Sequence, residues 1–301
     1  MGYCPKCGAA VTGDSEFCGR CGAPLGQGVG HGGTGGATPS SRVTQLRAKH
    51  RRLARIWLAF IAVGAVILVL ANPGVDLLFL LAVAPGAYLV WHFHHADKYK
   101  EESTRLLLGT FVLGALSTIP ALLIEVLDTP ASLPDNPVFI FLYFLLGVGL
   151  VEEGMKFLSV RGFAYRSPHF DEAMDGIIFG ITAALGFATV ENIGYVLQYG
   201  VVTAFIRAFV SVPGHAFWGA IWGYFLAESK VQRKPMLAAV GLGIAVFLHG
   251  LFDTVATIVP NPILGLVILG GLVWVLYFRV VKKEIAKAQQ ESLYAPGRPG
   301  Q

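Results

Sequence analysis

Hydrophobic residues follow one another in long runs along most of this chain, beginning near Ile56. A helix needs roughly 20 mostly apolar residues to cross the hydrocarbon core of a membrane. The sequence predicts eight such spans, at residues 55–72, 76–95, 106–126, 138–160, 174–197, 204–227, 236–258 and 262–280. Proline and glycine separate several of them, as in Asn72-Pro73-Gly74 and Pro260-Asn261-Pro262. We therefore expect an all-α polytopic membrane protein.

Composition supports a lipid-embedded chain. Of its residues, 54% are apolar and only 14% are charged, and the mean hydropathy is +0.60, whereas about a quarter of the residues in soluble domains are charged. The pI of 8.9 would also suit a nucleic-acid-binding protein. The basic residues flank the apolar runs, however, and do not form one patch. We interpret them as determinants of membrane topology and expect no nucleic-acid partner.

Lysine and arginine are concentrated in alternate connections between the predicted spans. These segments include Arg42, Arg47, Lys49, Arg51, Arg52 and Arg55, then Lys98, Lys100 and Arg105, then Arg161 and Arg166, then Lys230, Arg233 and Lys234, and finally Arg279, Lys282, Lys283 and Lys287. Cytoplasmic loops of membrane proteins carry an excess of Lys and Arg. We expect both termini in the cytosol of a bacterial-type cytoplasmic (inner) membrane. No signal peptide is expected, because the first residues include cysteines and glycines where an apolar segment would be needed.

The four cysteines occur as two identical spacings, Cys4-Pro-Lys-Cys7-Gly and Cys18-Gly-Arg-Cys21-Gly. Each CxxC turn lets two thiolates face one ion, and two such turns give a closed tetrahedral Cys4 site of the structural kind. So short a segment cannot build a hydrophobic core, so zinc binding would supply most of its folding free energy. A pair of disulfides or a thioredoxin-like redox centre is the alternative, which the doubled spacing disfavours.

The sequence pattern divides the chain into four parts. Residues 1–25 are predicted to form the zinc ribbon, and 26–50 a flexible linker that is rich in Gly and Ser and then basic. Residues 51–285 are predicted to form the membrane domain, and 286–301 a disordered tail. We expect the tethered ribbon to recruit a cytosolic partner or a substrate tail.

Four successive predicted spans contain ionisable side chains, which are costly in a bilayer and usually serve a function. The fourth span contains Glu152-Glu153-Gly-Met-Lys156, in which Glu152 and Lys156 lie one helical turn apart. The other three contain Glu191-Asn192, then Pro213-Gly214-His215, and then His249 and Asp253 one turn apart. Pro213 is expected to interrupt its helix locally.

These groups suit hydrolysis. One glutamate of the pair can hold or deprotonate a water molecule, and Lys156 would pair with Glu152 and determine which carboxylate stays ionised. Two histidines and a further carboxylate can complete a metal site, or they can position water and stabilise an oxyanion directly. Both a catalytic divalent metal and a glutamate mechanism satisfy this set, and either adjacent glutamate can serve as the base.

The ordered motifs resemble those of the PrsW family. They are Glu152-Glu153-x-x-Lys156, Phe187-x-x-x-Glu191, His215 and His249-x-x-x-Asp253, within roughly residues 106–280. That family is related to the CAAX-prenyl proteases and to bacterial immunity and processing proteases, which show EExxxR, FxxxH and HxxxN or HxxxD motifs. The resemblance implies cleavage of membrane-associated proteins, such as anti-sigma factors, at a polar site within the membrane. Glu191 stands where the relatives have histidine.

We therefore predict an intramembrane endopeptidase whose site contains Glu152, Glu153, Lys156, Glu191, His215, His249 and Asp253. A non-catalytic zinc-ribbon sensor or scaffold is one alternative, and the complete polar set argues against it. An ion-coupled transporter is another, and the lack of an inverted repeat in the sequence disfavours it.

Purely structural roles are the alternative for the same residues. The Glu152–Lys156 pair would then only order its helix, His249 would make an interhelical hydrogen bond, and Glu191 with Asn192 would bridge helices. His215 would in that case only satisfy a broken helix. Asp175 and Arg207 are expected at cavity mouths, without a catalytic role. The histidines of the second predicted span, which we expect at the cytosolic interface and not in a metal site, are His92, His94 and His95 beside Asp97.

Overall fold

A computed structural model of the chain describes residues 2–3, 10–11, 75–128 and 136–295. The chain divides into two compact units, Met1–Val63 and Gly64–Gln301. In the first unit, β1 (Gly2–Tyr3) and β2 (Ala10–Val11) pair in antiparallel fashion. Residues outside the described ranges include the four cysteines, the predicted linker and the span predicted at 55–72.

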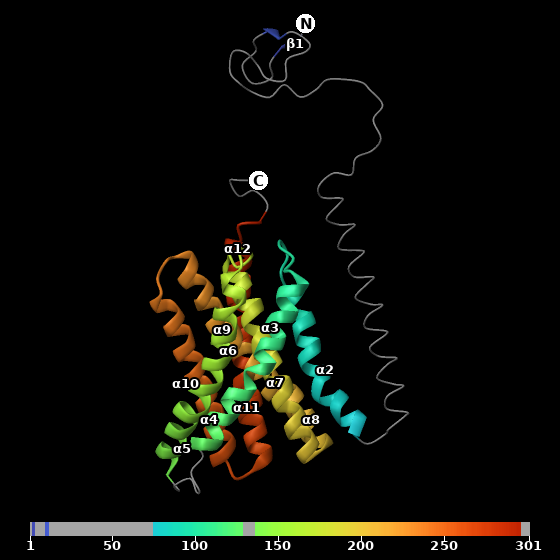
Figure 1. Ribbon diagram of the computed structural model, residues 1–301, viewed down its shortest axis with the longest axis vertical. Helices are drawn as coiled ribbons and strands as arrows, with labels where there is room; N and C mark the ends of the chain where they lie inside the picture. The colour runs from blue at the N-terminus through green and yellow to red at the C-terminus, as the bar shows by residue number, and fades with distance from the viewer. Residues whose placement is uncertain (1, 4–9, 12–74, 129–135, 296–301) are drawn as a thin grey trace. The chain divides into compact units, whose positions relative to one another are not determined.

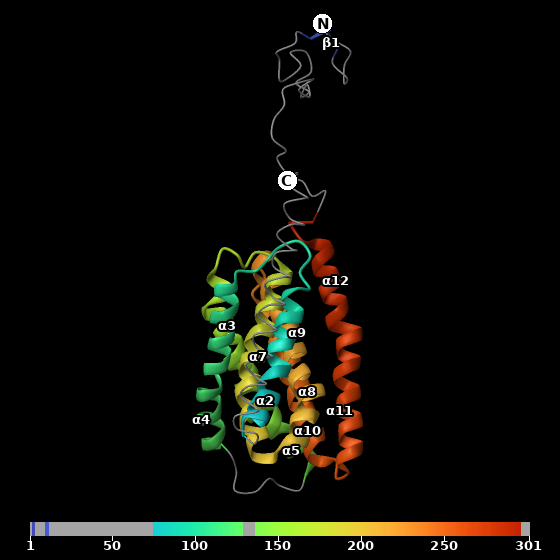
Figure 2. The same ribbon diagram turned by 90° about the vertical axis from the view of Figure 1, so that its right-hand side faces the viewer.

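The described part of the second unit consists of helices that lie side by side, with α7 and α9 between the others (Figures 1 and 2). Their bounds are α2 (Val75–His94), α3 (Thr104–Leu116), α4 (Thr118–Asp128), α5 (Pro137–Tyr143), the π-helix η1 (Phe144–Gly149), α6 (Leu150–Gly162), the 3-10 helix η2 (Ala164–Arg166), α7 (Ala173–Tyr199), α8 (Val201–Phe209), α9 (Ser211–Val231), α10 (Met236–Ile258), α11 (Pro262–Leu276), the π-helix η3 (Tyr277–Val281) and α12 (Lys282–Glu291).

Seven stretches of these helices are long and apolar enough to cross a membrane, and they confirm the predicted all-α membrane fold. They are Leu77–His94, Thr104–Leu127, Pro137–Arg166, Ala173–Tyr199, Val201–Val231, Met236–Ile258 and Ile263–Glu291. Each overlaps one predicted span. The last stretch continues to Glu291, so the tail predicted to begin at residue 286 is wrong for its first residues. The reason is that polar residues of α12 extend the same helix beyond the apolar run.

α7 is the central helix, and its residues from Ala173 to Thr189 are all buried. It packs against α9 through glycines. A Cβ placed on Gly176 would lie 2.1 Å from the backbone oxygen of Gly223, and one on Gly180 would lie 2.2 Å from the oxygen of Gly219. Small residues let two helix backbones approach this closely within a membrane. The packing brings Glu191 of α7 and His215 of α9 into the same region of the bundle.

Two spans change their helical geometry next to predicted site residues. η1 comes just before α6, and a Cβ on Gly250 of α10 would lie 2.7 Å from Cα of Leu145, so α10 packs directly on η1. π-Helical turns occur frequently at functional sites. In the sixth predicted span, the break lies at Val210 (φ −125, ψ −65) and not at Pro213. Pro213 lies in the first turn of α9. Backbone N–H groups there have no intrahelical acceptor, so the N–H that proline lacks is not needed.

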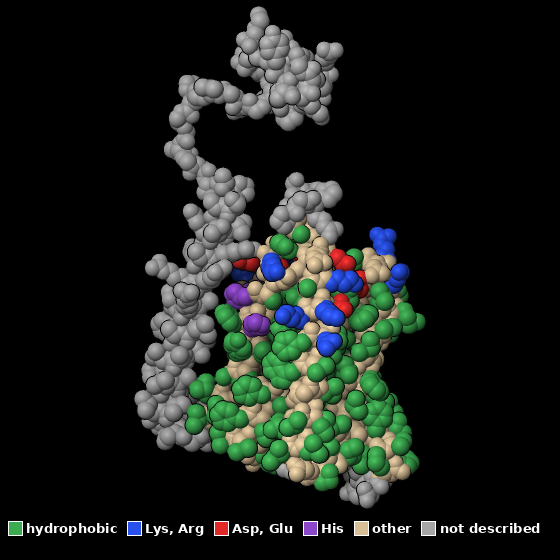
Figure 3. Space-filling view, turned by 180° about the vertical axis from the view of Figure 1, so that it is seen from behind, with side chains coloured by type: hydrophobic (Ala, Val, Ile, Leu, Met, Phe, Trp, Pro, Cys, Tyr) green, Lys and Arg blue, Asp and Glu red, His purple; other side chains and the backbone are tan. Residues whose placement is uncertain are grey.

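Charged side chains gather near one end of the second unit, whereas hydrophobic side chains cover most of the remaining face in Figure 3. At this end the Nζ atom of Lys100 lies 2.7 Å from Asp175, 2.8 Å from Asp171 and 3.3 Å from Glu102. Asp175 therefore belongs to an ion-pair network and does not line the large cavity described below, contrary to its expected place at a cavity mouth.

The same network holds the residues that follow α12. The Ser292 hydroxyl donates to Glu172 at 2.7 Å, and the Tyr294 hydroxyl donates to Asp171 at 2.8 Å. Burial of the Glu172 carboxyl group raises its pKa, while hydrogen bonds from Lys100 and Tyr294 lower the pKa of Asp171. These contacts attach the C-terminal helix to the loop between η2 and α7.

Candidate active site

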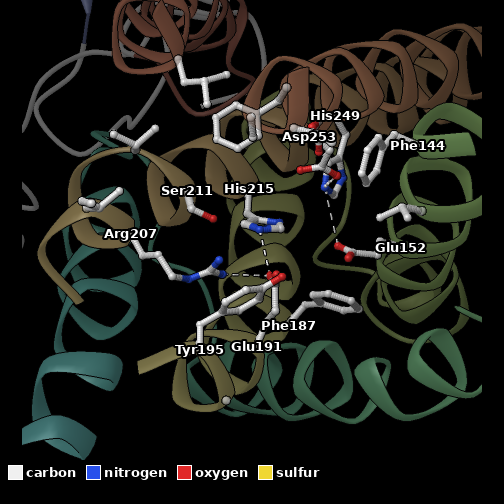
Figure 4. A pocket seen from close by; sticks show the side chains of 18 of the residues that line it. Phe144, Glu152, Phe187, Glu191, Tyr195, Arg207, Ser211, His215, His249 and Asp253 are labelled. Carbon is white, nitrogen blue, oxygen red and sulfur yellow. Dashed lines mark hydrogen bonds and ion pairs between the residues drawn. The ribbon is translucent and has the colours of Figure 1, made fainter. Parts of the chain in front are cut away.

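A cavity of about 910 Å³ opens between the helices at the end of α7 that includes Glu191 (Figure 4). Apolar side chains make up most of its lining. The predicted site residues that line it are Glu152, Glu191, His215, His249 and Asp253. The other two, Glu153 and Lys156, are 0% exposed and do not belong to the lining. The structure thus brings together residues from α6, α7, α9 and α10.

Lys156 connects the two glutamates of α6 to α9. Its Nζ atom lies 2.9 Å from Oε2 of Glu152, 2.8 Å from Oε1 of Glu153 and 3.0 Å from Nδ1 of His215. The ring of Phe187 lies on another side of the ammonium, with its centroid 4.0 Å from Nζ. Because charged groups are costly to bury without partners, this buried ammonium and the two carboxylates depend on one another.

The contacts of His215 determine which of its ring nitrogens has the proton. An ammonium group only donates, so Nδ1 of His215 accepts a hydrogen bond from Lys156. A neutral imidazole then has its proton on Nε2, which lies 3.1 Å from Oε2 of Glu191 (Figure 4). His215 thereby links α9 to α7, with its Nε2–H facing the Glu191 carboxylate.

His249 lies among carboxylates. Its Nδ1 atom lies 3.0 Å from Oε1 of Glu153, and its Nε2 atom lies 3.4 Å from Asp253 and 3.8 Å from Glu152. The indole ring of Trp218 stacks on the imidazole with a centroid separation of 4.3 Å. Hydrogen bonding at Nδ1 and stacking together orient the ring, so that Nε2 faces the cavity side of the cluster.

The two adjacent glutamates differ in their surroundings. Both oxygens of Glu153 have partners, because Oε1 faces Lys156 and His249 while Oε2 accepts a hydrogen bond from Nε1 of Trp222 at 3.0 Å. Glu152 contacts the same lysine through one oxygen and lines the cavity. Glu152 is therefore the glutamate that can meet a water molecule or a substrate in the cavity.

Arg207 of α8 is a site residue whose contact with the predicted cluster the sequence analysis missed. Its guanidinium group lies 3.2 Å from Oε2 of Glu191, and its Nε atom donates to Oδ1 of Asn192 at 2.8 Å. Asn192 in turn donates to the carbonyl oxygen of Ala82 in α2 at 2.7 Å. The available signal was the Glu191-Asn192 pair itself, since a carboxylate within an apolar span needs a counter-charge.

Glu125 of α4 was also missed, although it lines the same cavity. It is an acidic residue within an otherwise apolar run of the third predicted span. That isolation is the signal that would have indicated a place in the site.

Four residues form a group of metal-ligand type, because Glu152, Glu153, His215 and His249 each offer a donor atom within 4.8 Å of the others. Carboxylate and imidazole donors of this kind suit zinc. Three of the four, however, already place a donor atom 2.8–3.0 Å from the ammonium of Lys156. A divalent ion and this ammonium would compete for the same atoms, so the arrangement does not fit a bound metal as it stands.

Comparison with known proteins identifies the family. The family model described as "PrsW family intramembrane metalloprotease" matches residues 102–281. A zinc-ribbon domain model matches residues 3–25. The chain is 31% identical to Protease PrsW of Bacillus subtilis (strain 168) over 204 residues, which cover 67% of this chain and 92% of that protein.

Further relatives agree. Protease PrsW of Shouchella clausii is 32% identical over 68% of this chain and 96% of its own length. Protease PrsW of Geobacillus kaustophilus is 34% identical over 57% of this chain and 76% of its own length. No solved structure matches the chain. The chain belongs to the PrsW family and is a multi-pass membrane peptidase with an N-terminal zinc-ribbon domain.

Proposed function

We propose that this peptidase hydrolyses peptide bonds of membrane-associated protein substrates, and that Glu152 is the general base. The observation that supports this assignment is the difference between the adjacent glutamates. Glu152 lines the cavity, whereas Glu153 is completely buried with both carboxylate oxygens engaged. A general base must reach the proton that it removes.

In the proposed reaction, Glu152 takes a proton from water as the water oxygen attacks the carbonyl carbon of the peptide bond. His249 acts as an imidazolium whose Nδ1–H donates to Glu153 and whose Nε2–H, on the side of Glu152 and Asp253, donates to the oxyanion that forms. Glu152 then passes its proton to the leaving amine, so that a carboxylic acid and an amine are released. Lys156 keeps Glu152 ionised, and Glu153 orients His249.

Glu191 and His215 have a supporting role in this proposal. Oε2 of Glu191 lies 3.1 Å from Nε2 of His215 and 3.2 Å from the guanidinium group of Arg207, and these groups form the wall of the cavity opposite Glu152 in Figure 4. We assign them to the positioning of the scissile segment. Asp253 lies one helical turn from His249, and its negative charge attracts the Nε2 side of the imidazole ring.

The cavity indicates the kind of substrate. Its volume of about 910 Å³ lies near the upper end of ligand pockets, and its lining is mostly apolar. An extended segment of a few residues from a membrane-associated protein would fit these properties. Anti-sigma-factor-like proteins are the substrates that we propose from the family resemblance.

We further propose that residues 1–25 act as a zinc ribbon that recruits a cytosolic partner or a substrate tail, through the linker at 26–50. Residues 51–285 would form the protease domain, in a bacterial cytoplasmic membrane with both termini in the cytosol. The concentration of basic connections at one end of the helices supports this orientation.

The test is cleavage of co-expressed single-pass membrane proteins by the wild type and by matched variants. Glu152→Gln should abolish cleavage. Glu153→Gln and His249→Ala should reduce it at least about 100-fold, since removal of one catalytic electrostatic group costs about that much. Gly243→Ala in α10 is the control, because the added Cβ meets no atom of another described helix within 4 Å. All variants are compared at equal amounts in the membrane.

Cleavage that persists in Glu152→Gln but disappears in Glu153→Gln would reverse the assignment of the base. If the wild type yields no products across a broad panel of membrane proteins, or all variants yield the same products, the zinc-ribbon scaffold becomes the better account of this chain.

A further inference from the structure

The group of residues that would hold a catalytic metal already surrounds a cation. Nζ of Lys156 lies within hydrogen-bond distance of Glu152, Glu153 and His215, which are three of the four potential ligands. The lysine side chain is 0% exposed. This ammonium contacts two carboxylates and a ring nitrogen. It therefore compensates the same negative charges and occupies the same lone pairs as a divalent ion would.

The contacts of His249, the fourth potential ligand, support the same conclusion. Nδ1 of His249 faces Oε1 of Glu153, and that oxygen is also the one that Lys156 contacts. Glu153 therefore orients an imidazole on one side and binds an ammonium on the other, with Trp222 on its second oxygen. Each oxygen of this carboxylate already has a partner among the protein's own side chains.

We propose that the ammonium of Lys156 takes the place of a metal ion in this site, and that the peptidase works without a metal in the membrane. The inference rests on the proposed hydrolysis by Glu152 and names the cation that accompanies it. Zinc is then confined to the N-terminal ribbon of residues 3–25. The description of the family as metalloproteases leads to the opposite expectation, so a measurement of metal content separates the two.

The location of Lys156 supports a permanent role for its charge. Its counter-charges Glu152 and Glu153 are on the same helix, four and three residues earlier, so α6 fixes the group without help from a ligand. The ring of Phe187 covers the ammonium at 4.0 Å. Cation–π contacts of this kind are strongest when the cation is desolvated.

The first experiment measures metal per chain by mass spectrometry, in full-length protein purified in detergent. The wild type should contain about one zinc ion, as a single Cys4 site requires. The variant with Cys4, Cys7, Cys18 and Cys21 replaced by serine should contain none.

A metal ion that remains in the cysteine-free protein, and that is lost on an added His249→Ala substitution, would overturn the inference. This readout does not depend on activity. Loss of cleavage in Glu152→Gln tests the proposed function separately, so failure of the inference and failure of the proposed function are distinguishable.

The second experiment removes the ammonium. Lys156→Ala in the cysteine-free protein leaves the four donors without their cation, and we expect it to bind Co²⁺ with a visible absorption spectrum that wild-type Lys156 prevents. Lys287→Ala is the matched control, because Nζ of Lys287 donates to the hydroxyl of Tyr224 at 2.7 Å, and Tyr224 is not one of the four potential ligands. A folded Lys156→Ala protein that binds no Co²⁺ would overturn the inference. If that variant fails to fold, the metal content of the cysteine-free protein decides.

Discussion

Nδ1 of His215 lies 3.0 Å from the ammonium of Lys156, and this contact places the imidazole proton on the opposite nitrogen. Nε2 then faces Oε2 of Glu191 at 3.1 Å, so a directed series of polar contacts runs from α6 through α9 to α7. Arg207 ends the series on the far side of Glu191. Since each group sets the charge or proton position of the next, a substitution at one end of the series should affect the groups at the other end.

Arg207 provides the first test of this coupling. Arg207→Met should reduce cleavage about 10- to 100-fold, because a hydrogen bond to a charged group contributes about 1.5–3 kcal/mol. Arg207→Lys should recover only part of the activity. Lysine keeps the positive charge, but it lacks the planar fork that contacts Glu191 and Asn192 together.

The measurement is kcat and KM for a purified substrate in detergent, with Arg161→Met as the control at a site outside the cavity lining. If Arg207 only supported folding, the lysine and methionine variants would lose stability to a similar degree without separating in kcat. Equal kcat for the wild type and Arg207→Met would show that the series does not reach the reacting groups.

Trp222 tests the proposed orienting role of Glu153. Trp222→Phe removes the indole N–H that donates to Oε2 of Glu153 at 3.0 Å, while most of the ring volume remains. We expect kcat to fall about tenfold, in line with loss of one hydrogen bond to a charged group. Trp91→Phe, in a partly exposed position on α2, is the control for general effects on the protein. An unchanged kcat for Trp222→Phe would mean that Glu153 does not need this donor.

Much of the fold could be predicted from the sequence, because lipid requires long apolar runs and these are directly visible. The runs at 236–258 and 174–197 correspond closely to α10 and α7. The break at Val210 could not be predicted in the same way, since no proline or glycine occupies that position. It depends on how α8 and α9 pack against neighbouring helices.

The candidate site was predictable as a set of residues but not as a geometry. The cost of burying charge indicates that Glu152, Lys156 and His249 share a site. Sequence spacing could not tell which of Glu152 and Glu153 meets the cavity, because the answer depends on Trp222 and on the approach of α10. The partnership of Arg207 with Glu191 depends likewise on the placement of α8 beside the end of α7.

Close packing of α7 on α9 predicts a sharp effect of one methyl group. A Cβ on Gly219 would lie 2.6 Å from the backbone oxygen of Gly180, and backbone cannot move as a flexible side chain does. Gly219→Ala should therefore lower the free energy of unfolding by about 1–3 kcal/mol, the usual cost of overpacking. Gly243→Ala, whose added Cβ meets no neighbouring helix within 4 Å in the described part of the chain, should not. Thermal unfolding of both variants in the same detergent gives the comparison, and equal transition temperatures would contradict the packing shown.

The charged end of the second unit predicts an unusual dependence of stability on pH. Burial, together with the neighbouring Asp175, raises the pKa of Glu102 to about 9, although Lys100 lies 3.3 Å away. That ammonium is nearer to Asp175 and Asp171, at 2.7 and 2.8 Å. Between the ordinary carboxyl pKa near 4.5 and this value, the folded protein binds a proton at Glu102 that the unfolded chain releases. The contribution of Glu102 to stability therefore decreases as pH rises through this window.

Glu102→Gln isolates that contribution, because the amide is neutral at every pH and resembles the protonated carboxyl group in shape. We expect the two proteins to unfold at similar temperatures near pH 5, and the variant to become the more stable of the two as the pH is raised toward 8. Lys100, Asp171 and Glu172 also titrate with shifted pKa values, but they are present in both proteins, so the difference between the two curves reports on Glu102. If Glu102 were instead an ionised partner of Lys100, removal of its charge would destabilise the protein at neutral pH. A variant that unfolds at a lower temperature than the wild type at pH 7 to 8 would therefore show that Lys100 pairs with an ionised Glu102, as well as with Asp171 and Asp175.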